Sequence, residues 1–142
     1  MIYTGYFSKI KDFTDQKNIV SISVSNPKWI YIDKMLKELA PTYKLLNDFR
    51  NDKITESDYV KQFNDMLNKL DAKKIYNELH ALSPNPIITC HCGTKHFCHR
   101  HLVAEWLQTK LNIKIAEYKQ GNISRFEGRI VPSDNSTQLK LL

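Results

Sequence analysis

Short β-rich segments alternate with longer segments of helical periodicity along this chain, and this alternation is the strongest constraint on its fold. The β-rich segments are residues 2–7, 18–25, 87–92 and 113–118. Helical patterns occupy residues 55–70, 71–82 and 99–111, with two shorter helices expected within residues 29–50. Strands separated by helices predict an α/β fold, a compact sandwich whose mainly parallel sheet is flanked by helices.

The most regular helical segment follows Thr55. Thr55 and Asp58 have the spacing of a capping box, in which each side chain accepts a backbone N–H at the start of a helix. Aromatic and aliphatic side chains then recur every three or four residues as far as Leu70. We therefore assign this apolar stripe to the core rather than to a ligand site.

Length and charge bound the organisation of the chain. Its 142 residues fit one domain, which we place at residues 1–118 with a tail or hairpin extension over residues 119–142. In that extension, Arg125 and Arg129 are the charges that we expect to be able to reach a ligand. The net charge of +6 is spread along the chain, which suits either general solubility or a nucleotide or nucleic-acid partner.

The amino terminus has no signal-peptide pattern, and no apolar run approaches the length of a membrane span. We therefore expect a cytoplasmic protein with no membrane partner.

Cysteine and histidine are concentrated in the segment IITCHCGTKHFCHRH, residues 87–101. All three cysteines of the chain, Cys90, Cys92 and Cys98, lie in it. In a reducing compartment this clustering indicates thiol reactivity or metal binding rather than disulfides. Packing is the alternative for the first two cysteines, because they would share one face of a strand and cysteine is often simply a small buried residue.

Cys98, His99 and Arg100 are our candidate catalytic residues. They lie where a strand leads into a helix, and ligands of open α/β sheets bind beyond the carboxyl ends of the strands. A helix start favours anions and lowers the pKa of a thiol. Cys98 would then be a thiolate nucleophile, His99 an acid or base, and Arg100 a fork for a phosphate or carboxylate.

Zinc is the competing interpretation of the same segment. The three cysteines, together with His96 or His99, would supply a Cys₃His site. Against this, cysteines two residues apart in a strand lack the usual knuckle turn, and no second ligand pair follows. We therefore expect no cofactor and keep zinc as an alternative.

Several segments resemble the domain-of-unknown-function family 488, a bacterial and phage group of small α/β proteins. They are YTGYF (residues 3–7), Ile22 to Trp29 with its PKW, LAP (residues 39–41) and, most specifically, FCHRHLVAEW (residues 97–106). The resemblance covers residues 1–118. The family's Asp-Val-Arg-type segment after the second strand is replaced here by a loop with Ser23, Ser25, Asn26 and Lys28.

The family's layout implies that strand ends, that loop and the helix start converge on one pocket. The ligand-binding residues expected on this basis are Thr4, Gly5, Tyr6, Ser25, Lys28, Trp29, Cys92 and Arg100.

We expect an enzyme, or a degenerate enzyme, that binds a phosphate-bearing small molecule such as a nucleotide or nucleoside derivative. Arg100 would hold the anion, and Trp29 or Tyr6 would stack on a base or sugar. The alternatives are a non-catalytic module that sequesters a nucleotide or binds nucleic acid, and a structural zinc protein.

Overall fold

A parallel sheet of four strands forms the centre of the protein. The computed structural model describes residues 1–10, 18–30, 32, 34–91 and 97–131. The strands are β1 (Tyr3–Tyr6), β2 (Ile19–Ser21), β3 (Ile87–Cys90) and β4 (Ala116–Glu117). They lie in the order β2-β3-β1-β4, and every neighbouring pair is parallel. The predicted α/β fold with a parallel sheet is confirmed.

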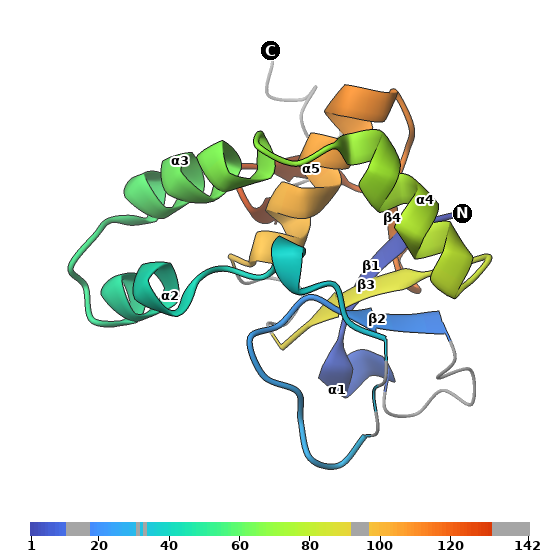
Figure 1. Cartoon of the computed structure of the whole chain (residues 1–142), viewed down its shortest axis with the longest axis horizontal. Coiled ribbons are helices and arrows are strands. Elements are labelled where there is room, and N and C mark those ends of the chain that lie inside the picture. Colours follow the sequence, from blue (N-terminus) through green and yellow to red (C-terminus); the bar gives the residue numbers. More distant parts are fainter. Residues whose placement is uncertain (11–17, 31, 33, 92–96, 132–142) are drawn as a thin grey trace.

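Helices cover both faces of this sheet. They are α1 (Phe7–Ile10), the 3₁₀ helix η2 (Lys37–Leu39), α2 (Tyr43–Arg50), α3 (Glu56–Leu67), α4 (Ala72–Leu82) and α5 (His99–Leu111). Figure 1 shows α3, α4 and α5 on one face and the short α1 on the other.

The alternation of strand side chains explains the two covered faces. Val20 and Ile88 point to the larger apolar core, which the helices α2–α5 complete. Their neighbours Ile19 and Ile87 point the other way, into a smaller cluster with Phe7 of α1. Because successive strand residues face opposite sides, apolar runs such as these require cover on both.

Local hydrogen bonds set the starts of the central helices. The predicted capping box is present: Thr55 N donates to Asp58 Oδ2 and Asp58 N to Thr55 Oγ1, both at 3.0 Å. Asp71 caps α4 through its carboxylate, which accepts from Lys73 N at 3.0 Å and from Lys74 N at 3.3 Å. Each cap satisfies amide groups that the first helical turn leaves without a partner.

Two predicted elements are shorter than expected. The strand predicted over residues 18–25 ends at Ser21. The Ser21 hydroxyl donates to Asn26 Oδ1 at 2.6 Å and accepts from Ser23 N at 3.2 Å, and these local bonds accompany a turn of the chain. The first of the two helices predicted within residues 29–50 is only η2. Residues before it are held extended beside β2, where Leu36 N donates to Ser21 O at 3.0 Å.

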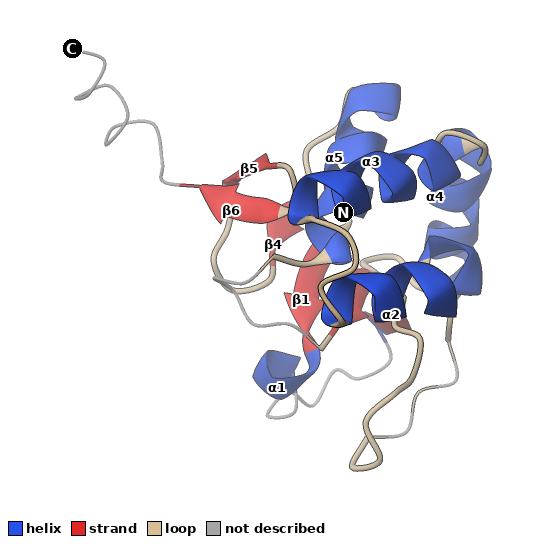
Figure 2. Ribbon diagram, turned by 90° about the vertical axis from the view of Figure 1, so that its left-hand side faces the viewer, coloured by secondary structure: helices blue, strands red, loops and turns tan. Residues whose placement is uncertain are grey.

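A small antiparallel hairpin follows the sheet, formed by β5 (Ser124–Phe126) and β6 (Arg129–Val131). Figure 2 shows it beside α5. At its turn, Gly128 has φ +90°, and Gly128 O accepts from Cys98 N at 2.9 Å. The hairpin therefore contacts the start of α5 directly.

None of the described helices combines the length and the apolar character that crossing a membrane requires.

Candidate functional site

A cavity of about 160 Å³ lies at the carboxyl edge of the sheet. We call it the His99 pocket. It is lined by Ser23, Val24, Ser25, Pro41, Tyr43, Leu46, Arg50, Cys90, His91 and His99. These residues come from the turn after β2, the end of β3, the start of α5, and the segment that enters and forms α2. The position agrees with the rule that open parallel sheets bind ligands beyond their carboxyl ends.

The start of α5 is organised by Cys98. This residue is the N-cap, in extended conformation, and its Sγ accepts from Arg100 N at 3.5 Å. A sulfur that accepts from a helix-start amide lies where developing negative charge is stabilised. The predicted helix start at Cys98 is therefore present.

His99 has a defined tautomer. Its Nε2 lies 2.7 Å from the carbonyl oxygen of Ile22, which can only accept, so Nε2 carries a proton and donates it. Burial lowers the pKa of His99 to about 4, against the opposing effect of the Ile22 hydrogen bond and with help from the charges of Arg100 and His91. The ring is therefore neutral near pH 7, and its Nδ1 is an acceptor 3.8 Å from Cys98 Sγ.

Cys90 and Cys98 are paired. Their sulfur atoms are in direct contact, as in a disulfide, but their Cα atoms are 7.7 Å apart. Relaxed disulfides span about 4.4–6.8 Å between Cα atoms. The Cα separation exceeds this range, so the two residues fit a pair of adjacent thiols better than a relaxed disulfide. Cys90 lines the His99 pocket whereas Cys98 does not, and both side chains are almost fully buried.

Arg100 points away from the pocket mouth and into the protein. It is fully buried and forms an ion pair with Glu117, with Nη2–Oε2 at 2.9 Å and Nε–Oε1 at 3.4 Å. Its Nη1 donates to Cys90 Sγ at 3.2 Å, and its guanidinium lies 5.3 Å from the centre of the Tyr6 ring. The anion that Arg100 holds in this structure is thus a carboxylate of the chain itself.

A second arginine extends this buried network. Arg125 of β5 donates through Nη2 to Thr4 Oγ1 at 2.6 Å and through Nε to His101 Nδ1 at 3.0 Å. Thr4 in turn donates to Glu117 Oε1 at 2.5 Å. The pKa of Arg125 is lowered to about 10, mainly by burial, with the charge of Glu117 opposing the shift and that of Arg100 adding to it. Arg100 thus bonds the Glu117 carboxylate directly, and Arg125 is connected to it through the Thr4 hydroxyl.

His101 is a fully buried member of this network. Its Nδ1 accepts from Arg125, so its neutral ring carries its proton on Nε2, which is buried and has no partner among the described residues. Burial, followed by the charges of Arg100 and Arg125, lowers its pKa to about 2. His101 is therefore a neutral acceptor that orients Arg125.

The predicted ligand residues separate into distinct groups. Ser25 lines the His99 pocket, whereas Lys28 and Trp29 are exposed and do not line it. Thr4 and Gly5 are buried inside the sheet.

The Tyr6 ring is half-buried and packs against Arg100. Cys92, with the alternative zinc ligand His96, lies outside the described residues. In the part of the chain that is described, no group of three or more potential metal-ligand side chains occurs.

Sequence reasoning missed the residues contributed by distant segments. Arg50 and Tyr43 of α2 line the pocket, and Tyr43 is 68% exposed. The sequence pattern of this segment predicts a helix and gives no sign of a binding site. For Glu117, the sequence predicts a place in the last strand of the sheet and no part in a site. The one available signal was an acidic residue in an otherwise apolar strand pattern, since buried carboxylates are nearly always paired.

The fold and the site together define a small parallel α/β protein with a cysteine–histidine centre at the start of a helix. A family model described as the active DUF488-N3 subclade, DUF488-N3a, matches residues 15–111, more than half of the chain. The protein therefore belongs to the domain-of-unknown-function family 488. No curated protein and no solved structure matches the chain.

Proposed function

We propose that this protein is an enzyme that acts on a phosphate-bearing small molecule, such as a nucleotide or nucleoside derivative, in the His99 pocket. The observation that carries the proposal is the hydrogen-bonded His99 ring. Its neutral Nδ1 faces a cysteine sulfur, which is the relation of a base to a nucleophile. The matching family model is described as active, which agrees with a catalytic centre.

The two contacting sulfurs divide the chemistry between them. Cys90 faces the pocket and is the nucleophile, and Cys98 connects it to His99. As Cys98 gives its proton to His99 Nδ1, it takes the proton of Cys90. The Cys90 thiolate then accepts a hydrogen bond from Arg100 Nη1. Both cysteines must be reduced for this transfer.

The thiolate then attacks an electrophilic carbon or phosphorus atom of the ligand. A bond forms from Cys90 Sγ to that atom, the bond to the leaving group breaks, and the leaving group takes the proton from His99. Water completes the cycle: His99 accepts a proton as the water attacks, the bond to sulfur breaks, and the proton returns to the thiol pair.

Ligand binding in this proposal relies on Arg50 instead of Arg100. The exposed Arg50 lines the pocket and offers the charge for a phosphate, and the exposed Tyr43 ring offers a surface for a base. Ser23 Oγ, in the same lining, is buried and has no hydrogen-bond partner among the described residues. A ligand that bonds this hydroxyl would remove an unfavourable unpaired group.

A thermal-shift screen tests binding. Reduced protein is heated with nucleotides, nucleosides and sugar phosphates, and the screen is repeated on Arg50→Gln and on Lys53→Gln. Both substitutions remove one exposed positive charge, but Lys53 does not line the pocket. A specific ligand should stabilise the wild-type chain and Lys53→Gln, and stabilise Arg50→Gln much less. Equal losses in both variants would refute a specific site.

A turnover assay on the ligand that is found tests catalysis. We expect Cys90→Ser and His99→Gln to retain binding and lose turnover by a factor of about a hundred or more, as is typical of general acid–base residues and nucleophiles. Binding without turnover in the wild-type chain would refute the enzyme and leave a sequestering module. If both variants retained wild-type turnover, the cysteine–histidine centre would not be the catalytic one.

A further inference from the structure

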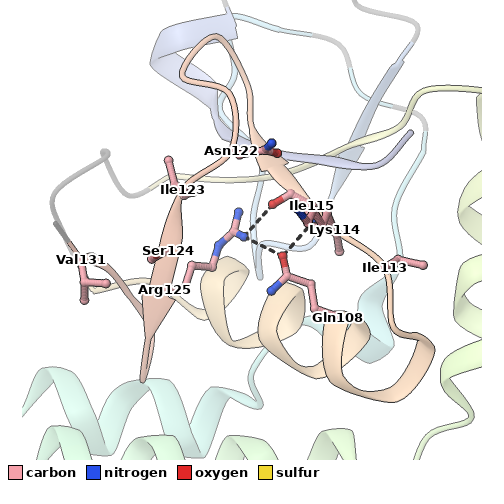
Figure 3. Close-up of a pocket in the computed structure, with 9 residues that line it drawn as sticks. All are labelled: Gln108, Ile113, Lys114, Ile115, Asn122, Ile123, Ser124, Arg125 and Val131. Carbon is pink, nitrogen blue, oxygen red and sulfur yellow. Dashed lines mark hydrogen bonds between the residues drawn. The ribbon is translucent and has the colours of Figure 1, made fainter. Parts of the chain in front are cut away.

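A second cavity lies away from the His99 pocket. It has a volume of about 620 Å³ and lies between the carboxyl-terminal half of α5, the segment that enters β4, and the hairpin (Figure 3). We call it the Arg125 pocket. Its lining residues are Gln108, Ile113, Lys114, Ile115, Asn122, Ile123, Ser124, Arg125 and Val131. None of them lines the His99 pocket.

The polar floor of this pocket is rigidly held. Arg125 Nη1 donates to the Ile115 carbonyl at 2.8 Å and to Gln108 Oε1 at 3.3 Å, and both bonds are drawn in Figure 3. Gln108 Oε1 also accepts from Ile115 N at 3.0 Å. With Thr4 and His101 on its other nitrogens, the guanidinium is fixed before any ligand arrives. A fixed cation loses little conformational entropy when a ligand binds, and Arg125 offers an anion mainly its charge, because four of its five N–H groups already have acceptors.

The charge of the pocket has one sign. Lys114 and Arg125 are cations, and among the described residues of the lining there is no carboxylate side chain. Glu117, the carboxylate nearest to this arginine in the buried network, is already paired with Arg100 through two hydrogen bonds. An anion placed in the Arg125 pocket would thus meet two positive charges and, in the described part of the lining, no repelling side chain.

The remaining lining residues give the pocket a mixed chemistry. Four aliphatic side chains form apolar surface: Ile113, Ile115, Ile123 and Val131. The side chains of Asn122 and Ser124 add hydrogen-bond donors. A cationic floor with aliphatic walls and a few polar groups is the usual composition of a small-molecule site.

We propose that the Arg125 pocket binds a small organic oxyanion, a phosphate monoester or carboxylate with a compact aliphatic group. The oxyanion lies between Lys114 and Arg125, and the aliphatic group lies against the isoleucines. The site is separate from the proposed catalytic pocket, and its existence does not depend on any activity there.

Chemical-shift perturbation of backbone amides tests the proposal. The reduced chain is titrated with isobutyl phosphate, isovalerate and inorganic phosphate at constant ionic strength, with chloride as the reference. We expect saturable shifts for isobutyl phosphate or isovalerate at residues 113–115 and 122–124, and weaker binding of inorganic phosphate, which lacks the aliphatic group. Comparison of the first two probes identifies the oxyanion that is preferred.

Two matched variants locate the binding. Lys114→Gln and Lys110→Gln each remove one exposed positive charge close to the end of α5, but only Lys114 lines the pocket. Loss of a charge-assisted contact should weaken binding about fivefold or more in Lys114→Gln and leave Lys110→Gln unchanged.

The proposal is overturned by the absence of saturable shifts, by equal weakening in both variants, or by shifts confined to residues 22–25 and 90–91. The last outcome would assign the anion to the His99 pocket. Absence of turnover in the His99 pocket would not change these results, so the two proposals are tested independently.

Discussion

Removal of the Arg100 guanidinium should lower the free energy of unfolding much more than removal of the Arg129 guanidinium, which also pairs with a glutamate. Arg100→Met keeps the long side chain but leaves the Glu117 carboxylate without the donors at 2.9 and 3.4 Å. Breaking a buried ion pair on one side costs about 3–5 kcal/mol. Because Glu117 keeps the Thr4 hydroxyl and the nearby charge of Arg125, we expect the lower end, about 3 kcal/mol.

Arg129→Met is the matched control. Arg129 also forms two hydrogen bonds with a glutamate, at 2.6 and 3.2 Å to Glu56, but the two side chains are 46% and 40% exposed. Exposed pairs contribute about 0–1 kcal/mol to stability. The two variants therefore differ in burial and share the chemistry of the pair.

Urea denaturation followed by circular dichroism measures both variants. At about 3 °C per kcal/mol for a chain of this size, Arg100→Met should also lower Tm by about 10 °C, and Arg129→Met by about 3 °C or less. The double variant Arg100→Met/Glu117→Leu should recover part of the loss, because the buried carboxylate is gone, while Arg125 loses the stabilising charge of Glu117. A loss below about 1 kcal/mol in Arg100→Met would refute the assignment of Arg100 to a buried structural pair.

Two further perturbations have a definite sign. His99 and His101 have pKa values of about 4 and about 2 in the folded chain, against about 6.5 when unfolded, so the unfolded chain binds more protons below about pH 6.5. The free energy of unfolding should therefore fall as pH decreases from about 6.5 toward 4, by up to about 1.4 kcal/mol per pH unit for each histidine, and a flat series of urea titrations would contradict this. The second perturbation concerns glycine: in urea titrations at neutral pH, Gly128→Ala should lower the free energy of unfolding more than Gly121→Ala. Both glycines have positive φ, but a Cβ at Gly128 would overlap the Phe97 ring, whereas a Cβ at Gly121 would have nothing within 4 Å. Equal losses of stability in the two variants would show that the Phe97 ring moves aside freely.

Elements defined by local signals were predicted well from the sequence. The capping box at Thr55 and the start of α5 at Cys98 both depend on residues within one helical turn. The parallel sheet followed from the alternation of strands and helices. By contrast, residues 34–36 pair with β2, and no local pattern specifies that contact. Tertiary pairing overrides helical periodicity there.

The structure has the predicted helix start at Cys98, but it does not bring all of the predicted site residues together. The sequence places Cys98, His99 and Arg100 together at a helix start, and the structure agrees. It does not reveal that Arg100 turns inward, because Glu117 is 17 residues away along the chain and Thr4 is 113 residues from that glutamate. Ion pairs between distant segments depend on the fold and have no signature in local spacing.

The first turn of α5 sends three consecutive side chains in three directions. His99 reaches the turn after β2, Arg100 reaches β4, and His101 reaches the hairpin. Consecutive helical residues are rotated by about 100° from each other, so one turn serves all three neighbourhoods. Insertion or deletion of a single residue here would rotate every partner out of place at once, and no single substitution elsewhere could compensate. We therefore expect this turn to keep the same length in related chains. A substitution of one of its three side chains should be accompanied by a substitution of the residue that it contacts.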